Sequence, residues 1–239
     1  MTAETDLLQR VRDVLRSDTS IGFDEAAIVL GLSNGALLVT GEVADVSVKR
    51  RTLRTAAAVV APRPIVDRLH VRAAQRMEDG MIGDLVRDAL LEEPALSNCR
   101  IRIWIKGQPE VVSAPPLASG AIDILVADGV VTLDGDVPGL GQKRLAGALP
   151  WWVPGSRDVI NGLGVSPPEE DNDGEITDAV RLVLEKDPFV NPGQIRVATN
   201  NATVTLDGLV PTESERDMAE HDAWYVFGVE DVINRIAVG

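Results

Sequence analysis

The chain has 239 residues, of which 45% are apolar, and a formal net charge of −14. This length fits one large or two to three small domains, the composition is typical of a globular protein, and no apolar run approaches the roughly 20 residues of a membrane span. Two histidines and one cysteine leave little for metal or nucleophilic chemistry, so we expect no catalytic residue, no metal site, no cofactor and no transmembrane segment.

The first predicted module spans residues 1–72 and begins with a charged amphipathic helix. Because this helix lacks the basic, apolar and small-residue order of a signal peptide, we expect a cytoplasmic protein, with the inner membrane as a peripheral contact at most. The second helix carries the cations Lys49, Arg50, Arg51 and Arg54. Helical spacing places Arg50 and Arg54 on its solvent side, with Arg51 beside them. They are candidates for binding lipid headgroups, and the alternative is a solvated face that pairs with acidic side chains.

The second predicted module spans residues 80–165 and contains an insertion of about 20 residues near 102–120. At its start, isoleucines alternate with polar or aromatic residues, namely Arg100, Arg102, Trp104 and Lys106. The alternation predicts a strand at the edge of the sheet, followed by a loop through Pro115-Pro116. The cations would protect that edge from pairing, or Trp104 between Arg102 and Lys106 marks an interfacial contact.

Pro150 falls inside the second helix of this module, where it lacks the N–H that an interior turn needs. We therefore expect the helix to end early. Trp151 and Trp152 would then lie at a surface, either packed between modules or in contact with a partner or membrane.

Residues 166–174 form an acidic, apolar-poor linker, and the third predicted module spans 175–239. Ile176, Val180 and Leu184 recur at helical spacing, and two β-branched runs follow around the turn-forming pair Asn200-Asn201. A second helix ends at Gly228, and a short apolar strand completes the module.

The same order of elements recurs along the chain. V-R-x-x-L begins at three places, Val11, Val86 and Val180, and three glycines then serve as counting positions, Gly41, Gly135 and Gly208. Apolar and basic residues align without a gap over the thirty positions after each glycine. The repeat predicts an α+β protein of three tandem α-β-β-α-β modules. Each would be a small mixed sheet with two helices on one face, because a right-handed crossover places the second helix there.

The string Val-Thr-Leu-Asp-Gly-Leu-Val at 204–210 and Gly-Val-Glu-Asp-Val-Ile-Asn at 228–234 resemble the BON domain of bacterial osmotically inducible proteins. The second copy resembles it through 130–137 and 158–161, and the first copy is the most divergent. The resemblance implies a module that associates with phospholipid surfaces or supports the envelope, often under osmotic stress, without enzymatic activity.

We therefore predict a non-enzymatic binding or adaptor protein whose partner is anionic phospholipid or a membrane-associated protein. The sequence does not predict its oligomeric state. The alternative is an intracellular docking or cation-responsive module of potassium type, since residues 166–239 carry 5 basic and 16 acidic side chains. Five of these acids crowd one helix: Glu213, Glu215, Asp217, Glu220 and Asp222. Such a segment would repel a polymer of phosphates, so we expect no nucleic-acid partner.

Overall fold

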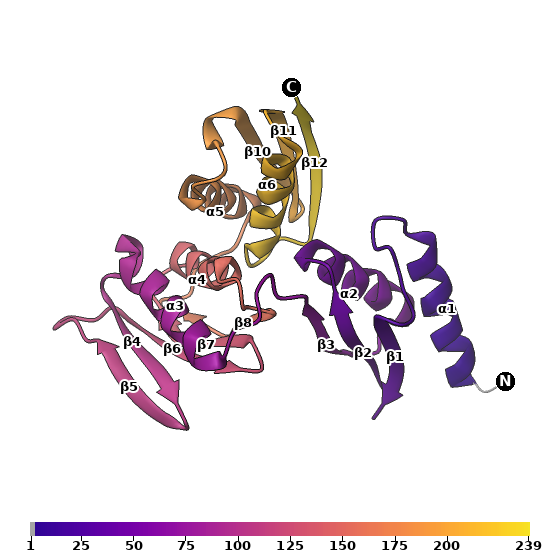
Figure 1. Ribbon diagram of the computed structural model, residues 1–239, viewed down its shortest axis with the longest axis horizontal. Coiled ribbons are helices and arrows are strands. Elements are labelled where there is room, and N and C mark those ends of the chain that lie inside the picture. Colours follow the sequence, from indigo (N-terminus) through magenta and orange to yellow (C-terminus); the bar gives the residue numbers. More distant parts are fainter. Residues whose placement is uncertain (1–2) are drawn as a thin grey trace. The chain divides into compact units, whose positions relative to one another are not determined.

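A computed structural model describes residues 3–239, and the chain divides into two compact units, unit 1 (residues 1–72) and unit 2 (residues 73–239). Unit 1 contains, in chain order, α1 (Ala3–Ser17), β1 (Ile28–Ser33), β2 (Ala36–Val43), α2 (Val46–Val60) and β3 (Ile65–Val71) (Figure 1). The sheet has the order β1-β2-β3, with the first pair antiparallel and the second parallel. Asn34 and Gly35 both have positive φ, the conformation that a two-residue hairpin turn requires.

Unit 2 contains two further sheets. The helices and strands of residues 73–165 are α3 (Asp79–Glu92), η1 (Pro94–Leu96), β4 (Cys99–Ile105), β5 (Gln108–Ser113), β6 (Gly120–Ala127), β7 (Val130–Val137), α4 (Leu140–Ala148), η2 (Leu149–Trp152), β8 (Asp158–Asn161) and β9 (Gly164–Val165). Those of residues 166–239 are α5 (Asp173–Lys186), η3 (Pro192–Gln194), β10 (Ile195–Asn200), β11 (Thr203–Val210), α6 (Glu213–Tyr225) and β12 (Asp231–Val238).

The sheet β10-β11-β12 repeats the pairing of unit 1, and β6-β7-β8 repeats it again inside the larger sheet of unit 2. In each case the hairpin is antiparallel and the strand after the second helix is parallel to the middle strand. The α+β class with small mixed sheets is therefore confirmed. The boundaries of the modules within unit 2 stay a prediction.

The same steric constraint explains the glycines at the three positions from which the repeats were aligned. Gly41, Gly135 and Gly208 lie at the same place in β2, β7 and β11. A Cβ atom at any of them would overlap a backbone carbonyl oxygen at or just before the paired strand, and these oxygens belong to Ala27, Ala121 and Gln194. A side chain is excluded there by the close approach of the backbones, which explains why the same residue type marks every copy.

The insertion differs from the prediction. β4 is not an edge strand, because it pairs with β6 on one side and with β5 on the other. Lys106 and Gly107, both with positive φ, form the turn between β4 and β5, so Lys106 leaves the alternating pattern of the strand. The edge is β5, in a segment that we expected to be loop. Figure 1 shows the β4–β5 hairpin projecting from unit 2.

The second helix of residues 73–165 ends early, as Pro150 predicted. α4 stops at Ala148 and continues as the 3-10 turn η2, which contains both tryptophans. Residues 166–172 of the predicted linker are not helical, and hydrogen bonds hold the linker against neighbouring elements. Glu169 accepts a hydrogen bond from the N–H of Leu140 at 2.7 Å, and Asn172 caps α5 through the N–H groups of Gly174 and Glu175.

Candidate functional site

The cations predicted on the second helix of unit 1 divide between its core side and its surface. Lys49 is only 6% exposed, its ammonium donates to the carbonyl of Leu69 at 2.5 Å, and it forms an ion pair with Asp67 at 2.9 Å. The prediction that Lys49 contributes to a surface site is therefore wrong, because β3 covers it. Arg50 and Arg51 are half-buried and Arg54 is exposed.

The predicted residues of the insertion also differ among themselves. Arg102 lies opposite Asp123 on β6 and binds it through two hydrogen bonds of 2.5 and 2.6 Å, so it holds two strands together. Trp104 is 37% exposed and Ile105 is 46% exposed, and Lys106 is exposed at the turn. These three consecutive residues are named the hairpin tip, and they line a groove of about 290 Å³ with the start of α3.

Trp151 and Trp152 contact the third predicted module. Trp151 stacks on Tyr225 with ring centroids 5.4 Å apart and ring planes 8° apart. Trp152 donates from its indole Nε1 to Oδ1 of Asp222 at 2.9 Å. The two tryptophans therefore connect η2 with α6, which is the packing alternative of the sequence prediction.

A buried arginine that sequence reasoning missed joins the same elements. Arg144 on α4 is fully buried, and it donates to the carbonyl of Phe227 at 2.9 Å and to Asp171 at 2.5 Å. The ammonium of Lys143 lies 4.2 Å from the centroid of the Phe227 ring. Nothing in the local pattern around Arg144 distinguishes it from a surface arginine, because its partners are 27 and 83 positions away.

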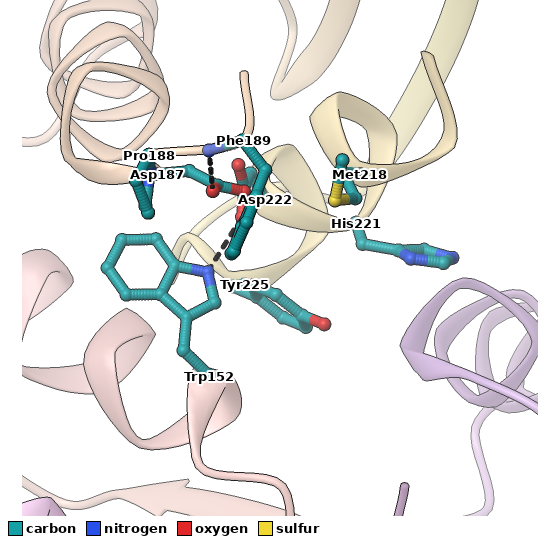
Figure 2. Close-up of a pocket in the computed structure, with 8 residues that line it drawn as sticks. All are labelled: Trp152, Asp187, Pro188, Phe189, Met218, His221, Asp222 and Tyr225. Carbon is teal, nitrogen blue, oxygen red and sulfur yellow. Dashed lines mark hydrogen bonds between the residues drawn. The ribbon is translucent and has the colours of Figure 1, made fainter. Parts of the chain in front are cut away.

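A pocket of about 310 Å³, named the junction pocket, opens beside Trp152. Figure 2 shows its lining, which comes from η2, from the segment that follows α5 and from one face of α6: Trp152, Asp187, Pro188, Phe189, Met218, His221, Asp222 and Tyr225. Most of this lining is aromatic or aliphatic. Of the predicted site residues, only Trp152 belongs to it.

Two carboxyl groups form the polar part of the junction pocket. Asp222 is 1% exposed and Asp187 is 8% exposed, and Asp187 also accepts the N–H of Phe189 at 2.8 Å (Figure 2). The pKa of Asp222 is raised from its ordinary 3.8 to about 8, mainly by burial and also by the nearby Asp187, while the hydrogen bond from Trp152 lowers it. Asp222 is therefore mainly protonated at neutral pH.

The acidic helix predicted in the third module does not present all of its acids to solvent. Glu215 is buried and accepts the N–H of Asn191 at 2.8 Å, and Arg216 pairs with Asp217 at 2.8 Å. With Asp222 also buried, the expected acidic face is divided between core and surface. Within residues 3–239, no group of three or more His, Cys, Asp or Glu side chains is placed to hold a metal ion.

Comparison with known proteins identifies the family. The model of the BON domain matches residues 108–167 and 172–239, more than half of the chain. The chain belongs to the BON domain family. The resemblance of the second and third copies is thereby confirmed. Unit 1, which repeats the same order of elements, lies outside the matched residues.

One curated relative is the outer membrane lipoprotein DolP of Haemophilus influenzae, which is 32% identical over 120 residues. The match covers 48% of this chain and 62% of the relative, so less than two thirds of that protein is represented. Two solved structures of CdsD, a structural protein of the type III secretion system of Chlamydia trachomatis, are 13% and 14% identical. The alignments cover 100% and 98% of this chain and 100% and 92% of the CdsD chains. Both TM-scores are 0.25, which is too low to support a conclusion about the fold or function.

The relative corrects one prediction. The cytoplasmic location that we expected from the first residues is wrong, because the relative DolP is an outer membrane lipoprotein and points to the envelope. The charged helix α1 belongs to the fold of unit 1, with Val11 and Leu15 in its core, so it carries no information on the compartment. Among the described helices, none has the length and apolar character needed to cross a membrane.

Proposed function

We propose that this protein is a non-enzymatic binding protein of the cell envelope that attaches reversibly to phospholipid surfaces through the hairpin tip of unit 2. Membership of the BON family and the outer membrane location of the relative support a role in the envelope and attachment to a lipid surface. The observation that carries the proposal is the exposure of Trp104 and Ile105 at the end of a projecting hairpin, next to the cation of Lys106.

The chemistry of the hairpin tip suits the boundary between water and lipid. Tryptophan combines an apolar ring with a polar N–H, and lysine extends its ammonium toward headgroup phosphates. Two acids line the neighbouring groove, but both are engaged within the fold. Asp79 accepts the N–H groups of Asp128 and Gly129, and Asp84 pairs with Arg87 at 2.5 Å.

The expected attachment is weak. Trp104 and Ile105 are already more than half buried, so transfer of the rest into lipid contributes on the order of 1 kcal/mol for each side chain. A cation near an anionic surface contributes about 1 kcal/mol more. One hairpin therefore gives a reversible contact, which suits a protein that also binds partners, the adaptor form of the proposal.

Co-sedimentation of the full chain with vesicles of phosphatidylglycerol and phosphatidylethanolamine tests the proposal. Serine at both Trp104 and Ile105 should reduce the bound fraction about tenfold or more at limiting lipid. The matched control carries serine at Leu209 and Ile233, two exposed apolar residues on β11 and β12, and should bind like the wild type. Equal binding by both double variants, or greater loss in the control, would reject the hairpin tip.

The arginines of α2 offer a second contact, from unit 1. Arg54 is exposed and Arg50 lies beside it on the next turn of the helix. Glutamate at both positions should weaken binding at low ionic strength and have less effect at high salt, because salt screens exposed charges. Arg10→Glu, on the exposed side of α1, is the control for a general effect of net charge.

A further inference from the structure

We propose that the junction pocket binds the alkylammonium group of a small organic cation. The pocket brings together aromatic rings, a thioether and a buried carboxyl oxygen that accepts no hydrogen bond. This inference concerns a different surface from the hairpin tip and does not depend on the proposed function.

The walls of the pocket suit an apolar ligand surface. Trp152, Tyr225 and Phe189 contribute rings, and Met218 contributes a thioether (Figure 2). Its volume of about 310 Å³ is about ten times the roughly 30 Å³ of a water molecule and is at the small end of ligand sites. Phe189 is 72% exposed although it is large and apolar, so a ligand can reach the rings from solvent.

The polar end of the pocket holds two carboxyl groups, Asp187 and Asp222. Oδ1 of Asp222 accepts the indole N–H of Trp152, whereas Oδ2 is buried and accepts no N–H, and the carboxyl interacts with Asp187 when it is protonated. Asp187 faces Asp222 from the end of α5, and neither lysine nor arginine is among the residues that line the pocket. His221 on α6 is the remaining titratable side chain of the lining besides Tyr225. A ligand cation would supply the positive charge that these carboxyl groups lack.

An organic cation fits this arrangement better than a metal ion. Calcium takes six to eight oxygen ligands and magnesium takes six, whereas two carboxyl groups and aromatic walls supply few. An alkylated ammonium spreads its charge over an apolar surface, and it is attracted both to ring faces and to a carboxylate. Trp152 and Tyr225 can therefore contact the alkyl groups while Asp222 balances the charge.

Binding should be linked to proton release. The free pocket holds a proton on Asp222 at neutral pH, since the pKa of this carboxyl is about 8. A bound cation favours the ionised form, so the proton leaves as the ligand enters. Affinity should rise as pH increases toward 8 and then become constant. Burial, Asp187 and the Trp152 N–H set this range, and His221 is a further titratable side chain that lines the pocket.

Isothermal titration of the full chain with choline chloride tests the inference. The comparison ligands are 3,3-dimethylbutan-1-ol, which has the same shape without charge, and potassium chloride at equal ionic strength. We expect choline to bind at least about tenfold more tightly than either, with a heat that depends on the buffer because a proton is released. Equal binding of the neutral alcohol, or of potassium, would overturn the assignment of an organic cation.

Two variants locate the binding. Asp222→Asn keeps an oxygen for Trp152 but removes the charge, and it should weaken choline binding about tenfold and abolish proton release. Phe189→Leu, at an exposed position that leaves the fold intact, should weaken binding about threefold. Asp217→Asn, on the exposed part of α6, is the matched control. Wild-type binding in both Asp222→Asn and Phe189→Leu would overturn the proposal.

The alkylammonium group can come from a free solute or from a lipid headgroup. Vesicles of phosphatidylcholine distinguish these sources, because they carry the same group without the anionic charge used to test the hairpin tip. Recruitment to these vesicles that is lost in Asp222→Asn assigns the lipid as the source. Binding of free choline without such recruitment assigns a soluble ligand, and either result supports the pocket.

Discussion

Replacing Asp222 by asparagine should stabilise unit 2 at neutral pH. The asparagine oxygen can still accept the Trp152 N–H that Asp222 Oδ1 accepts at 2.9 Å. Its NH₂ group can donate to the facing Asp187, which the wild type achieves only when Asp222 holds a proton. The variant therefore keeps the contacts of the protonated carboxyl and removes the free energy needed to protonate it.

The magnitude follows from the pKa of the group in the two states. Folding raises the pKa of Asp222 from 3.8 to about 8, so the folded chain binds a proton that the unfolded chain has released. The contribution to stability is fully present below about pH 3.8, and it is lost as the pH rises to 8. Each pH unit in this range lowers the free energy of unfolding by about 1.4 kcal/mol, which amounts to at most about 4 kcal/mol at pH 7.

Urea unfolding followed by tryptophan fluorescence measures this effect in unit 2 alone, because all four tryptophans lie in it. The free energy of unfolding of Asp222→Asn minus that of the wild type should increase by about 1.4 kcal/mol per pH unit between pH 5 and 8. Asp217→Asn, an exposed control on the same helix, should give a difference that does not change with pH. A constant difference for Asp222→Asn, or destabilisation at every pH, would refute the reasoning.

Three other predictions concern how the chain is held together. Arg144→Met removes hydrogen bonds to Phe227 and Asp171 and should lower the free energy of unfolding of unit 2 by about 3 kcal/mol. The control Lys143→Met should lower it by about 1 kcal/mol or less, and equal effects of the two variants would contradict the role of Arg144. Gly135→Ala should lower the free energy of unfolding by about 3 kcal/mol in the same assay, because the new Cβ would overlap the carbonyl of Ala121. The control Gly141→Ala, with open space around it, should change this free energy by about 1 kcal/mol or less. A Gly135→Ala variant as stable as the wild type would contradict the explanation of the repeated glycines. Limited proteolysis with subtilisin, followed by mass spectrometry, should cut the chain first within residues 72–78, between the two units. The acidic linker should resist cleavage because Glu169, Asp171 and Asn172 form hydrogen bonds that hold it in place. First cleavage within residues 166–174 would contradict this prediction.

Local patterns predicted the elements whose causes are local. Pro150 ends α4 because of its own missing N–H. The turn predicted at Asn200-Asn201 forms one position later, at Asn201 and Ala202, because these two residues adopt the positive φ. The glycine repeat predicted equivalent places in three sheets, although its cause, a carbonyl oxygen on the paired chain, became visible only in the structure. The strand β5 was missed because Gln108–Ser113 contains just two apolar residues, and its pairing depends on the turn at Lys106.

The candidate sites depend on contacts between distant segments, which a single sequence does not predict. Lys49 and Arg54 have the same local pattern of a basic helix, yet Lys49 is buried because β3 places the carbonyl of Leu69 beside it. Asp222 was grouped with exposed acids of its helix, although Trp152, 70 positions earlier, covers it. Helical spacing correctly separates a helix into faces, but it does not say which face another module will cover.

Quenching of tryptophan fluorescence by vesicles of brominated phosphatidylglycerol and phosphatidylethanolamine tests the central claim most directly. Bromine quenches only rings that enter the lipid, and Trp224 is fully buried while Trp151 and Trp152 pack against α6. The account predicts that the wild type is quenched and that Trp104→Phe still sediments with the vesicles but loses the quenching. Quenching that persists in Trp104→Phe, or its absence from the lipid-bound wild type, would contradict attachment through the hairpin tip.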